Sequence, residues 1–407
     1  LCVVSGAVEG SRSLRPERPS ICDDAVHPGV LGLVEALVRA GLLHQEVADG
    51  ELMGVVVHPV IGGYAHSLLG ENCAAVHQRL VDEHARECAA DNVDTHGWLR
   101  YHFWATPDDG YWYNNVARHA AASEDVMALA SLATSEWRTA RTRTGPRSGY
   151  QADVEVVLAS LRAIVDDADH SVRDSPVLLG AAHWGLAMAY LYRMDCKTAA
   201  KHEVAIILLR RGLDELPRFE APLLWAEMQN DLGNAYAYRV NGNKAANFQI
   251  AVRCYYHALE VRMQGTLAWG ETQHCLGMAY ADREGGNKAA NMEEALAYFR
   301  RALDVRTRDA APLQWAATQH IMGSAHTGRV NGDKAANFDE AMACFRRALE
   351  VWTRETVPLR WAATQHSMGS AYTERVDGDE ATNLEAAVAC HRRALEVWTR
   401  ETVPLQW

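Results

Sequence analysis

The amino-acid sequence predicts an all-α fold whose C-terminal half is a stacked array of similar helix pairs. The first observation is a period, because tryptophans recur at intervals of 44, 46, 46 and 46 residues, at Trp225, Trp269, Trp315, Trp361 and Trp407. The second is the similar text behind the first four of them: WAEMQNDLGNAYAYR, WGETQHCLGMAYADR, WAATQHIMGSAHTGR and WAATQHSMGSAYTER. The third is the helical spacing of apolar residues within each copy. A fixed period of this length indicates a repeat architecture.

The first half of each copy is predicted to be a helix. Trp225, Leu232, Gly233 and Tyr236 follow one another at spacings of seven, one and three residues, which keeps them on one helical face. A loop such as RVNGNKAAN comes next, and its glycine ends the helix, at Gly242, Gly286, Gly332 and Gly378. An earlier copy of the repeat has Leu179 at the position that tryptophan occupies in the later copies. Five copies therefore run from about residue 176, and a sixth has begun at Trp407.

The second half of each copy is also predicted to be a helix. It is expected to open at an asparagine, because Asn is a favoured N-cap residue, and the candidates are Asn247, Asn291, Asn337 and Asn383. Two of these have Glu three residues later, at Glu294 and Glu340, as a capping box requires. Small and aromatic residues then follow at helical spacing, as at Ala295, Phe299 and Ala302.

These residues resemble the tetratricopeptide repeat family. Leu-Gly-x-x-Tyr in the first helix and Ala-x-x-x-Phe-x-x-Ala in the second form that family's pattern, and the match covers roughly residues 176–407. The usual repeat has about 34 residues, so the period here resembles the long variant of bacterial signalling proteins. The resemblance implies a right-handed superhelix whose first helices line a concave groove. Small residues should let adjacent helices approach closely, at Gly233, Gly277, Gly323 and Gly369.

The resemblance also implies a partner-binding face. It places ten polar residues in the concave groove: Asn230, Asn234, Tyr238, His274, His320, Ser324, Thr327, His366, Ser370 and Thr373. A groove that binds a protein or peptide segment is one interpretation, and a solvated polar face is the other. Histidines that occur once per repeat cannot share a metal ion, since ligands must lie about 2 Å from it. No metal site is therefore expected there.

Two further polar columns have structural interpretations. Each first helix is predicted to end at an arginine, because a positive charge is favourable at a helix C-terminus. These arginines are also expected to pair with the neighbouring repeat, and they are Arg193, Arg239, Arg283, Arg329 and Arg375. A glutamine column is expected to form a ladder between repeats, at Gln229, Gln273, Gln319 and Gln365. Recurring cysteines at Cys254, Cys344 and Cys390 are expected to be buried as small hydrophobic residues, because one repeat separates them.

The first 170 residues do not repeat. Residues 28–43 form a predicted amphipathic helix, residues 44–54 a polar turn, residues 55–57 a strand and residues 60–70 another helix. This order suggests a small winged-helix unit over residues 1–66, with a short strand pair. Residues 67–170 are predicted to be a helical connector, because Tyr111, His119, Leu129, Leu132 and Trp137 have the spacing of packed helices. The repeat array then occupies residues 171–407.

These N-terminal segments resemble the winged helix and helical connector of STAND-type (NB-ARC) signalling ATPases. His58 matches the His of the family's Met-His-Asp signature, while Val57 and Pro59 depart from it, and the match implies a nucleotide-sensing role for His58. Asp153 matches the Asp that ends the connector pattern. No GxxxxGK[ST] loop occurs in the sequence. We therefore expect the NTPase domain to lie outside this chain, and the chain to be a piece of a longer protein.

Composition narrows the classes of function. A net charge of -12 argues against a nucleic-acid partner, and no run of apolar residues is long enough for a membrane span or a signal peptide. The nine cysteines include no CxxC pair, which favours a reducing cytoplasm. HExxH and GxSxG motifs are absent, so neither enzymatic activity nor a cofactor is expected.

The sequence therefore predicts a non-enzymatic, ligand-sensing interaction scaffold. The resemblance makes it the sensor arm of a STAND-type NTPase, in intramolecular contact with an upstream NTPase domain. Two alternatives stay open. One is an interaction array tethered to an effector enzyme such as a caspase-like protease, and the other is a transcriptional regulator whose winged helix binds DNA.

Overall fold

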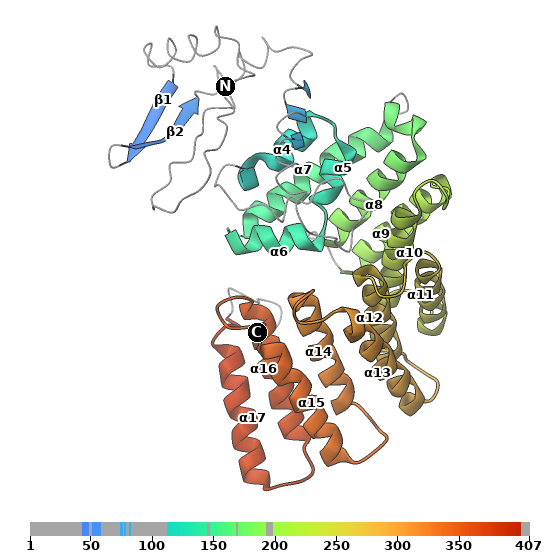
Figure 1. Ribbon diagram of the computed structural model, residues 1–407, viewed down its shortest axis with the longest axis vertical. Coiled ribbons are helices and arrows are strands. Elements are labelled where there is room, and N and C mark those ends of the chain that lie inside the picture. The colour runs from blue at the N-terminus through green and yellow to red at the C-terminus, as the bar shows by residue number, and fades with distance from the viewer. Residues whose placement is uncertain are drawn as a thin grey trace. The chain divides into compact units, whose positions relative to one another are not determined.

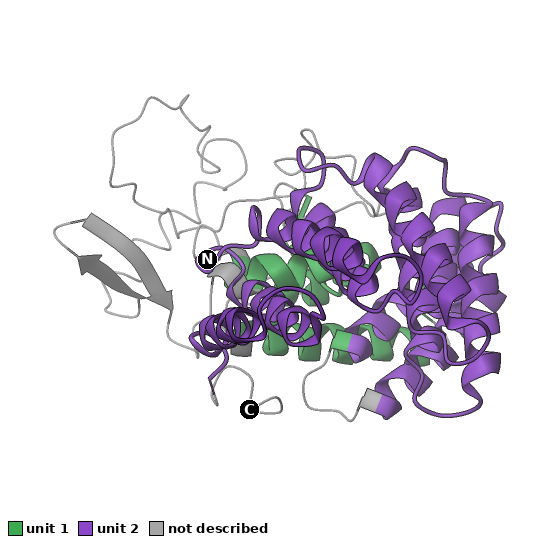
Figure 2. Ribbon diagram, turned by 90° about the horizontal axis from the view of Figure 1, so that it is seen from below, with its two compact units in different colours: residues 1–91, 99–173, 192–194 green, residues 92–98, 174–191, 195–407 purple. Residues whose placement is uncertain are grey.

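The computed structural model describes residues 43–48, 51–57, 74–75, 77–78, 81–82, 112–144, 147–167, 170–192 and 198–399. The chain divides into two compact units, coloured separately in Figure 2. Unit 1 comprises residues 1–91, 99–173 and 192–194, and unit 2 comprises residues 92–98, 174–191 and 195–407. His58, Arg193 and the predicted helix at 60–70 lie outside the described residues, as does the predicted helix at 28–43 except for Leu43, which begins a strand.

Unit 1 contains an antiparallel strand pair, β1 (Leu43–Ala48) and β2 (Glu51–Val57). Leu43 pairs with Val57 and Ala48 with Glu51, with a register shift at Glu46/Val47. The predicted strand pair is confirmed, but the prediction of a polar turn over residues 44–54 is wrong, because most of that segment is strand. The overlooked signal is the dipeptide Asp49-Gly50, since Asp-Gly is favoured in tight hairpin turns.

Unit 1 also contains helices α4 (Trp112–Ala122), α5 (Val126–Ser131), α6 (Ser135–Thr144) and α7 (Arg147–Asp166). α7 contacts each of the other three. The side chains of His119, Leu129, Leu132 and Trp137 are all buried, as their spacing predicted. Trp137 lies at the centre of this packing: its ring contacts Tyr113 at a centroid distance of 4.8 Å, and its side chain is fully buried.

In its described residues, unit 2 is an all-helical array of five helix pairs, which confirms the predicted fold class (Figure 1). After the 3-10 turn η2 (Ser171–Asp174), its helices are α8 (Pro176–Tyr192), α9 (Thr198–Glu215), α10 (Pro222–Ala237), α11 (Lys244–Leu259), α12 (Leu267–Ala281), α13 (Lys288–Val305), α14 (Pro312–Thr327), α15 (Lys334–Leu349), α16 (Pro358–Glu374) and α17 (Glu380–Leu395). The even-numbered helices are the first helices of the repeats, and the odd-numbered ones are the second helices.

The array curves toward its first helices. α10 contacts α12, α12 contacts α14, and α14 contacts α16, whereas no contact of this extent joins consecutive second helices in the part of the chain that the structure describes. Helices on the inner side of a curved stack lie closer together than those on the outer side. The first helices therefore line the concave side of unit 2.

Glycines set the closest approach within each repeat. A Cβ atom added to Gly233 would lie 2.6 Å from the ring of Tyr255, and one added to Gly323 would lie 2.8 Å from the ring of Phe345. Gly277 and Gly369 contact rings of their second helices in the same way. The prediction that these positions must be small is confirmed, since any side chain would push the two helices of a repeat apart.

The second helices begin four residues earlier than predicted. Their N-caps are Asn243, Asn287, Asp333 and Asp379, each of which accepts a hydrogen bond from a backbone amide of the first turn. Each cap directly follows a glycine with positive φ, and two such glycines, Gly285 and Gly286, precede Asn287. Asn247, Asn291, Asn337 and Asn383 are instead buried, and their Nδ2 atoms donate to loop carbonyls at 2.8 to 3.0 Å. They close the loop and do not cap the helix.

Two further expectations concern membranes and thiols. No helix of the described residues has the length and apolar character that a membrane crossing requires. Cys254, Cys344 and Cys390 are buried free thiols, as predicted. Burial raises the pKa of both Cys254 and Cys344 to about 11, so these thiols stay protonated at neutral pH and are poor nucleophiles.

Candidate functional site: the first-helix surface

A hydrogen-bond ladder joins the first helices of neighbouring repeats. Nδ1 of His274 lies 3.1 Å from Oγ1 of Thr318, and Nδ1 of His320 lies 3.0 Å from Oγ1 of Thr364. Each threonine hydroxyl also donates to the backbone carbonyl one turn earlier. A hydroxyl has a single proton, so in this arrangement the imidazole Nδ1–H donates to the threonine oxygen.

This ladder overturns part of the predicted groove. Asn230 is fully buried and its Oδ1 lies 3.1 Å from the hydroxyl of Thr272, while the side chain of His274 is also buried. Burial lowers the pKa of His274 well below its usual value, and burial with the nearby Arg360 guanidinium lowers that of His320 to about 4. Asn230 and His274 are therefore neutral contacts between repeats and do not face a partner.

The glutamine column does not form the predicted ladder. Gln273, Gln319 and Gln365 are buried, and among the described residues nothing hydrogen-bonds to the Oε1 atom of any of the three. The bonds between repeats are made instead by the residue directly after the glutamine, as at His274 and His320. Neighbouring residues on a helix point about 100° apart, so the sequence could not tell which of the two faces the next repeat.

The arginine column pairs with the preceding repeat at two positions. Arg239 holds both oxygens of Glu203 on α9 at 2.8 Å, and Arg329 holds those of Glu293 on α13 at 2.7 and 3.0 Å. These bidentate pairs confirm the prediction at Arg239 and Arg329. Arg283 instead stacks over the ring of Phe248, 4.6 Å from its centroid.

Arg375 makes a third kind of contact. It pairs with Asp377 of its own loop at 2.9 Å and stacks over the ring of Phe338, 4.4 Å from its centroid. The column therefore joins α16 to the second helix of the preceding repeat by stacking. Every arginine of the column in the described residues thus has a structural role.

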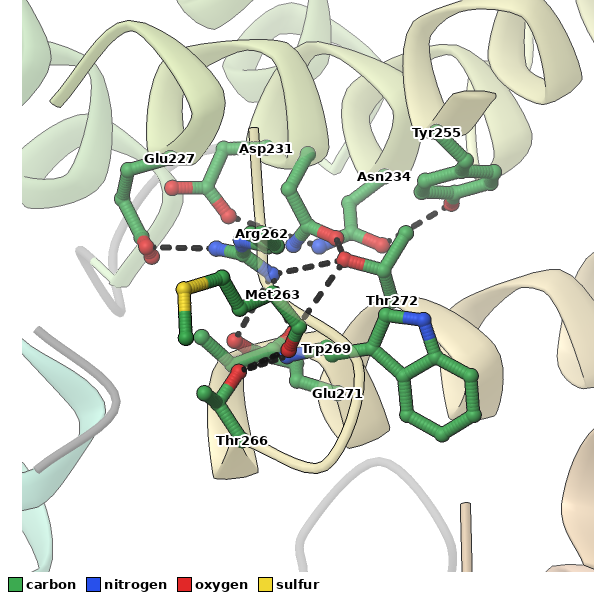
Figure 3. Close-up of polar contacts among 12 residues, drawn as sticks. Glu227, Asp231, Asn234, Tyr255, Arg262, Met263, Thr266, Trp269, Glu271 and Thr272 are labelled. Atoms are coloured by element: carbon green, nitrogen blue, oxygen red, sulfur yellow. Dashed lines mark hydrogen bonds and ion pairs between the residues drawn. The ribbon is translucent and has the colours of Figure 1, made fainter. Parts of the chain in front are cut away.

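A buried polar network lies between α10 and α12 (Figure 3). Arg262 pairs with Glu227 at 2.5 Å, and both side chains are almost fully buried. The Arg262 Nη1 atom also donates to the Ala268 carbonyl at 2.9 Å and to the Thr272 hydroxyl at 2.7 Å, and lies 3.3 Å from a Glu271 oxygen. A buried ion pair needs such additional hydrogen bonds, because burying an uncompensated charge destabilises the fold. The network holds two repeats together.

Asp231 borders this network and accepts a hydrogen bond from Trp184 Nε1 at 2.8 Å. Burial raises the pKa of Asp231, and the nearby Glu227 and Glu271 carboxylates raise it further. The carboxyl group is therefore held toward its protonated form.

The same register carries different chemistry in the later repeats. Arg262 and Glu227 correspond to Trp352 and Ala317, which are 90 residues further along the chain. Trp352 is buried, and its ring lies 5.7 Å from that of His320. A buried cation and its carboxylate are thus replaced together by an aromatic ring and a small residue. At this register the array therefore has a polar contact between its early repeats and an apolar one between its later repeats.

One pocket opens between α14 and α16. It has a volume of about 240 Å³ and is called the α14–α16 pocket; it is lined by Ser324, Thr327, Phe345, His366, Ser367, Ser370, Ala371 and Glu374. Four of the ten predicted groove residues line it: Ser324, Thr327, His366 and Ser370. The structure thus brings part of the predicted face together.

A second pocket opens between α10 and α12. It has a volume of about 310 Å³ and is called the α10–α12 pocket; its lining includes Ala237, Tyr238, Tyr255, Cys275, Met278, Ala279 and Asp282, together with residues at the start of α11 and in the following loop. Tyr238 is the one predicted groove residue among them. It is about half exposed, and its hydroxyl lies 3.5 Å from the Met278 sulfur.

The two pockets occupy the same place in the repeat. Six pairs of lining residues are equivalent, two repeats apart: Ala237 and Thr327, Tyr255 and Phe345, Cys275 and Ser367, Met278 and Ser370, Ala279 and Ala371, and Asp282 and Glu374. Each pocket therefore has a ring from a second helix as its wall and a carboxylate from the following first helix at its edge. In the repeat between them, Ile321 takes the place of Cys275 and Ser367 and packs on the core.

Five predicted residues lie outside both pockets: Asn230, His274 and His320 of the ladder, and also Asn234 and Thr373. Asn234 is half-buried and accepts a hydrogen bond from the Tyr255 hydroxyl at 2.9 Å, while Thr373 is exposed and donates to the Gly369 carbonyl at 3.0 Å. Sequence reasoning missed Met278, Asp282 and Glu374. Met278 has the register of Ser324, so an alignment of every repeat position, apolar residues included, would have found it.

Neither pocket carries metal-binding chemistry. Within the described ranges, no group of three or more His, Cys, Asp or Glu side chains is arranged to hold a metal ion.

Comparison with known proteins finds likenesses among solved structures alone. No family model matches the chain, and a search of curated proteins gives no significant match. A solved structure with a similar fold is the crystal structure of BtubC (BKLC) from P. vanneervenii, with 19% sequence identity and a TM-score of 0.44. The likeness covers 60% of this chain and 90% of that one.

Proposed function

We propose that the array is a non-enzymatic binding scaffold whose concave first-helix surface receives an extended polypeptide segment. The observation that carries this proposal is the pair of equivalent pockets on that surface, two repeats apart. A pocket that recurs with the period of the scaffold suits a ligand that is itself extended and repetitive along its length, as a polypeptide is.

The variation among the repeats supports the proposal. The ladder threonines that join neighbouring repeats keep their identity, at Thr272, Thr318 and Thr364. Residues that line the pockets change from repeat to repeat: the register of Met278 carries Asn234, Ser324 and Ser370 in the other copies. A constant frame with a variable concave face is the arrangement of repeat proteins that bind by their inner surface.

The test is a peptide selection followed by blocking of each pocket. Random peptides selected on the whole chain are measured against Ser370→Trp, which fills the α14–α16 pocket, and Met278→Trp, which fills the α10–α12 pocket. Arg346→Trp is the matched control, because Arg346 is exposed on the second helix α15. We expect at least one pocket variant to lose affinity about tenfold or more while the control keeps it. Peptides that bind all three variants equally well would contradict the proposal.

We further propose that this scaffold is the sensor arm of a STAND-type NTPase and contacts that domain in the whole protein. Two observations support this context. An antiparallel strand pair precedes a helical unit and the array, in the order that the resemblance implies. In the helical unit, two of the residues that carry the connector resemblance are in contact: Trp137 Nε1 donates to Asp153 at 3.2 Å, and Arg141 pairs with the same carboxylate at 3.0 Å.

The gene upstream of Leu1 tests this context. A P-loop within a few hundred codons is the expected result. A protease or DNA-binding domain there, with no P-loop, would contradict the STAND context and favour the tethered-enzyme or transcriptional alternative, while leaving the binding role of the array intact. In all three contexts a ligand acts by binding one state of the whole protein more tightly than another.

A further inference from the structure

Both pockets present a carboxylate that is available to a ligand. Asp282 and Glu374 stand at equivalent positions, and both side chains are exposed. Across the described segments, neither carboxylate has a hydrogen-bond donor or an ion-pair partner within bonding distance. Lys244, which also lines the pocket of Asp282, is paired with Glu284 at 3.6 Å.

The other polar groups of the α10–α12 pocket are occupied. Arg283 stacks over the Phe248 ring and donates to Asn291 at 3.2 Å, and the Tyr255 hydroxyl donates to Asn234. What remains toward the pocket is a ring wall, a thioether and one carboxylate. A side chain with an apolar stem and a cationic head fits this set, because the stem packs on the ring and the head reaches the carboxylate.

The α14–α16 pocket offers acceptors and no lining cation. The hydroxyl of Ser324 donates to the His320 carbonyl at 3.3 Å, and that of Thr327 donates to the Ser324 carbonyl at 2.8 Å. Their protons are therefore used, and their oxygens can only accept from a ligand. Burial lowers the pKa of His366, and the neighbouring His391 lowers it further, so the imidazole is neutral at pH 7. Glu374 is thus the charged group that this pocket presents.

We propose that the two pockets bind two basic side chains, arginine or lysine, of one extended polypeptide segment. This inference rests on the proposed function, and it adds the chemistry and spacing of the segment. Charge complementarity carries it: each pocket pairs an aromatic ring with an unpaired carboxylate, on a chain of net charge -12.

The spacing of the two basic residues follows from helix packing. The pockets are separated by two steps between contacting first helices. Packed helices lie about 8–10 Å apart, so the separation is roughly 16–20 Å. An extended chain rises about 3.3 Å per residue, which places the two basic residues about five or six positions apart. Once the first basic side chain is bound, binding of the second becomes an intramolecular step, which increases the affinity of the whole segment.

Fluorescence anisotropy with synthetic peptides tests the inference on the full chain. The probes are Gly/Ser/Thr peptides carrying two arginines about five or six positions apart, the same pair about two positions apart, and two controls with the arginines replaced by glutamine or glutamate. Asp282→Asn and Glu374→Gln are measured singly and together. Asp304→Asn and Glu385→Gln are the matched controls, since both residues are exposed on second helices.

We expect the widely spaced arginine peptide to bind most tightly. Each pocket variant should weaken it about three- to tenfold, and the double variant should remove its advantage over the closely spaced peptide. The control variants should change nothing. Equal binding of the glutamine or glutamate peptide, or unchanged affinity in the double variant, would overturn the basic-residue inference and leave the groove function standing. Failure of every peptide, together with failure of the random selection above, would overturn both.

Discussion

Nδ1 of His320 lies 3.0 Å from Oγ1 of Thr364, the equivalent of Thr318 in the next repeat. This contact joins α14 to α16 on the side of the first helices that faces the neighbouring repeat. It distinguishes two roles on the first-helix surface: His274 and His320 hold the repeats together, and residues further along the helices, such as Ser324 and Ser370, line a pocket.

Thr364→Val tests the structural role of the ladder. Valine has the shape of threonine but cannot accept the histidine proton, so the His320 Nδ1–H would be left without a partner. We expect the free energy of unfolding to fall by about 1–2 kcal/mol, measured by urea denaturation. Thr373→Val on the same helix is the control, because Thr373 is exposed and bonds only its own helix. Equal effects of the two substitutions would contradict a role for the ladder.

The ladder also predicts a dependence of stability on pH. The pKa of His320 is lowered to about 4 in the folded chain, and an unfolded histidine titrates near its usual value of about 6.5. Between these values the unfolded state binds more protons, so stability falls as the pH falls from about 6.5 to about 4. His320→Gln should reduce this slope by up to about 1.4 kcal/mol per pH unit. An unchanged slope in thermal melts across this range would show that His320 is not held neutral.

The raised pKa of Asp231 predicts the opposite dependence of stability on pH. Its pKa is raised by burial and by Glu227 and Glu271, so the folded state keeps a proton that the unfolded state loses above about pH 4. Stability from this group is therefore lost as the pH rises from there toward the raised pKa. Asp231→Asn keeps an acceptor for Trp184 and removes the charge.

We expect Asp231→Asn to raise the free energy of unfolding at pH 8 by about 1 kcal/mol or more and to flatten its decline with pH. Chemical denaturation at several pH values measures both. Asp214→Asn, at an exposed position on α9, is the matched control. A loss of stability at pH 8 in Asp231→Asn, with the control unchanged, would mean that the ionised carboxylate is favourable there.

Arg262 and Glu227 are replaced together by Trp352 and Ala317 in the later repeats. Substitutions of Arg262 and Glu227 should therefore have non-additive effects on stability. Arg262→Trp alone leaves Glu227 buried without its cation and should destabilise the chain by about 3–5 kcal/mol. The double variant Arg262→Trp with Glu227→Ala copies the combination at Trp352 and Ala317, and should recover about half or more of that loss. Thermal denaturation of the full cycle measures the coupling. Additive effects of the two substitutions would show that the two registers are not interchangeable.

The period and the glycines made the array predictable, because both act within one repeat. Gly233 must be small beside Tyr255 whatever the partner is, and Gly242 supplies the positive φ of the turn directly before the N-cap Asn243. The ends of the helices were harder to predict from the sequence. Asn243 and Asn247 are both asparagines at the start of one helix, and only the loop geometry decides that the first caps the helix while the second closes the loop.

The candidate site was predictable in part. Ser324, Thr327, His366 and Ser370 were identified and do line one pocket. His274 was misassigned because a single position on a helix separates a groove residue from a contact between repeats. Each pocket combines residues of three helices, so the sequence alone does not show that Asp282 and Glu374 line one.

Hydrogen–deuterium exchange of the full chain, with and without a selected peptide, tests the binding role of the concave surface most directly. We predict that the peptide protects the ends of the first helices, around residues 275–282 and 366–374, while the exposed faces of α15 and α17 exchange as before. Protection confined to the second helices, with residues 275–282 and 366–374 unchanged, would contradict binding on the first-helix surface.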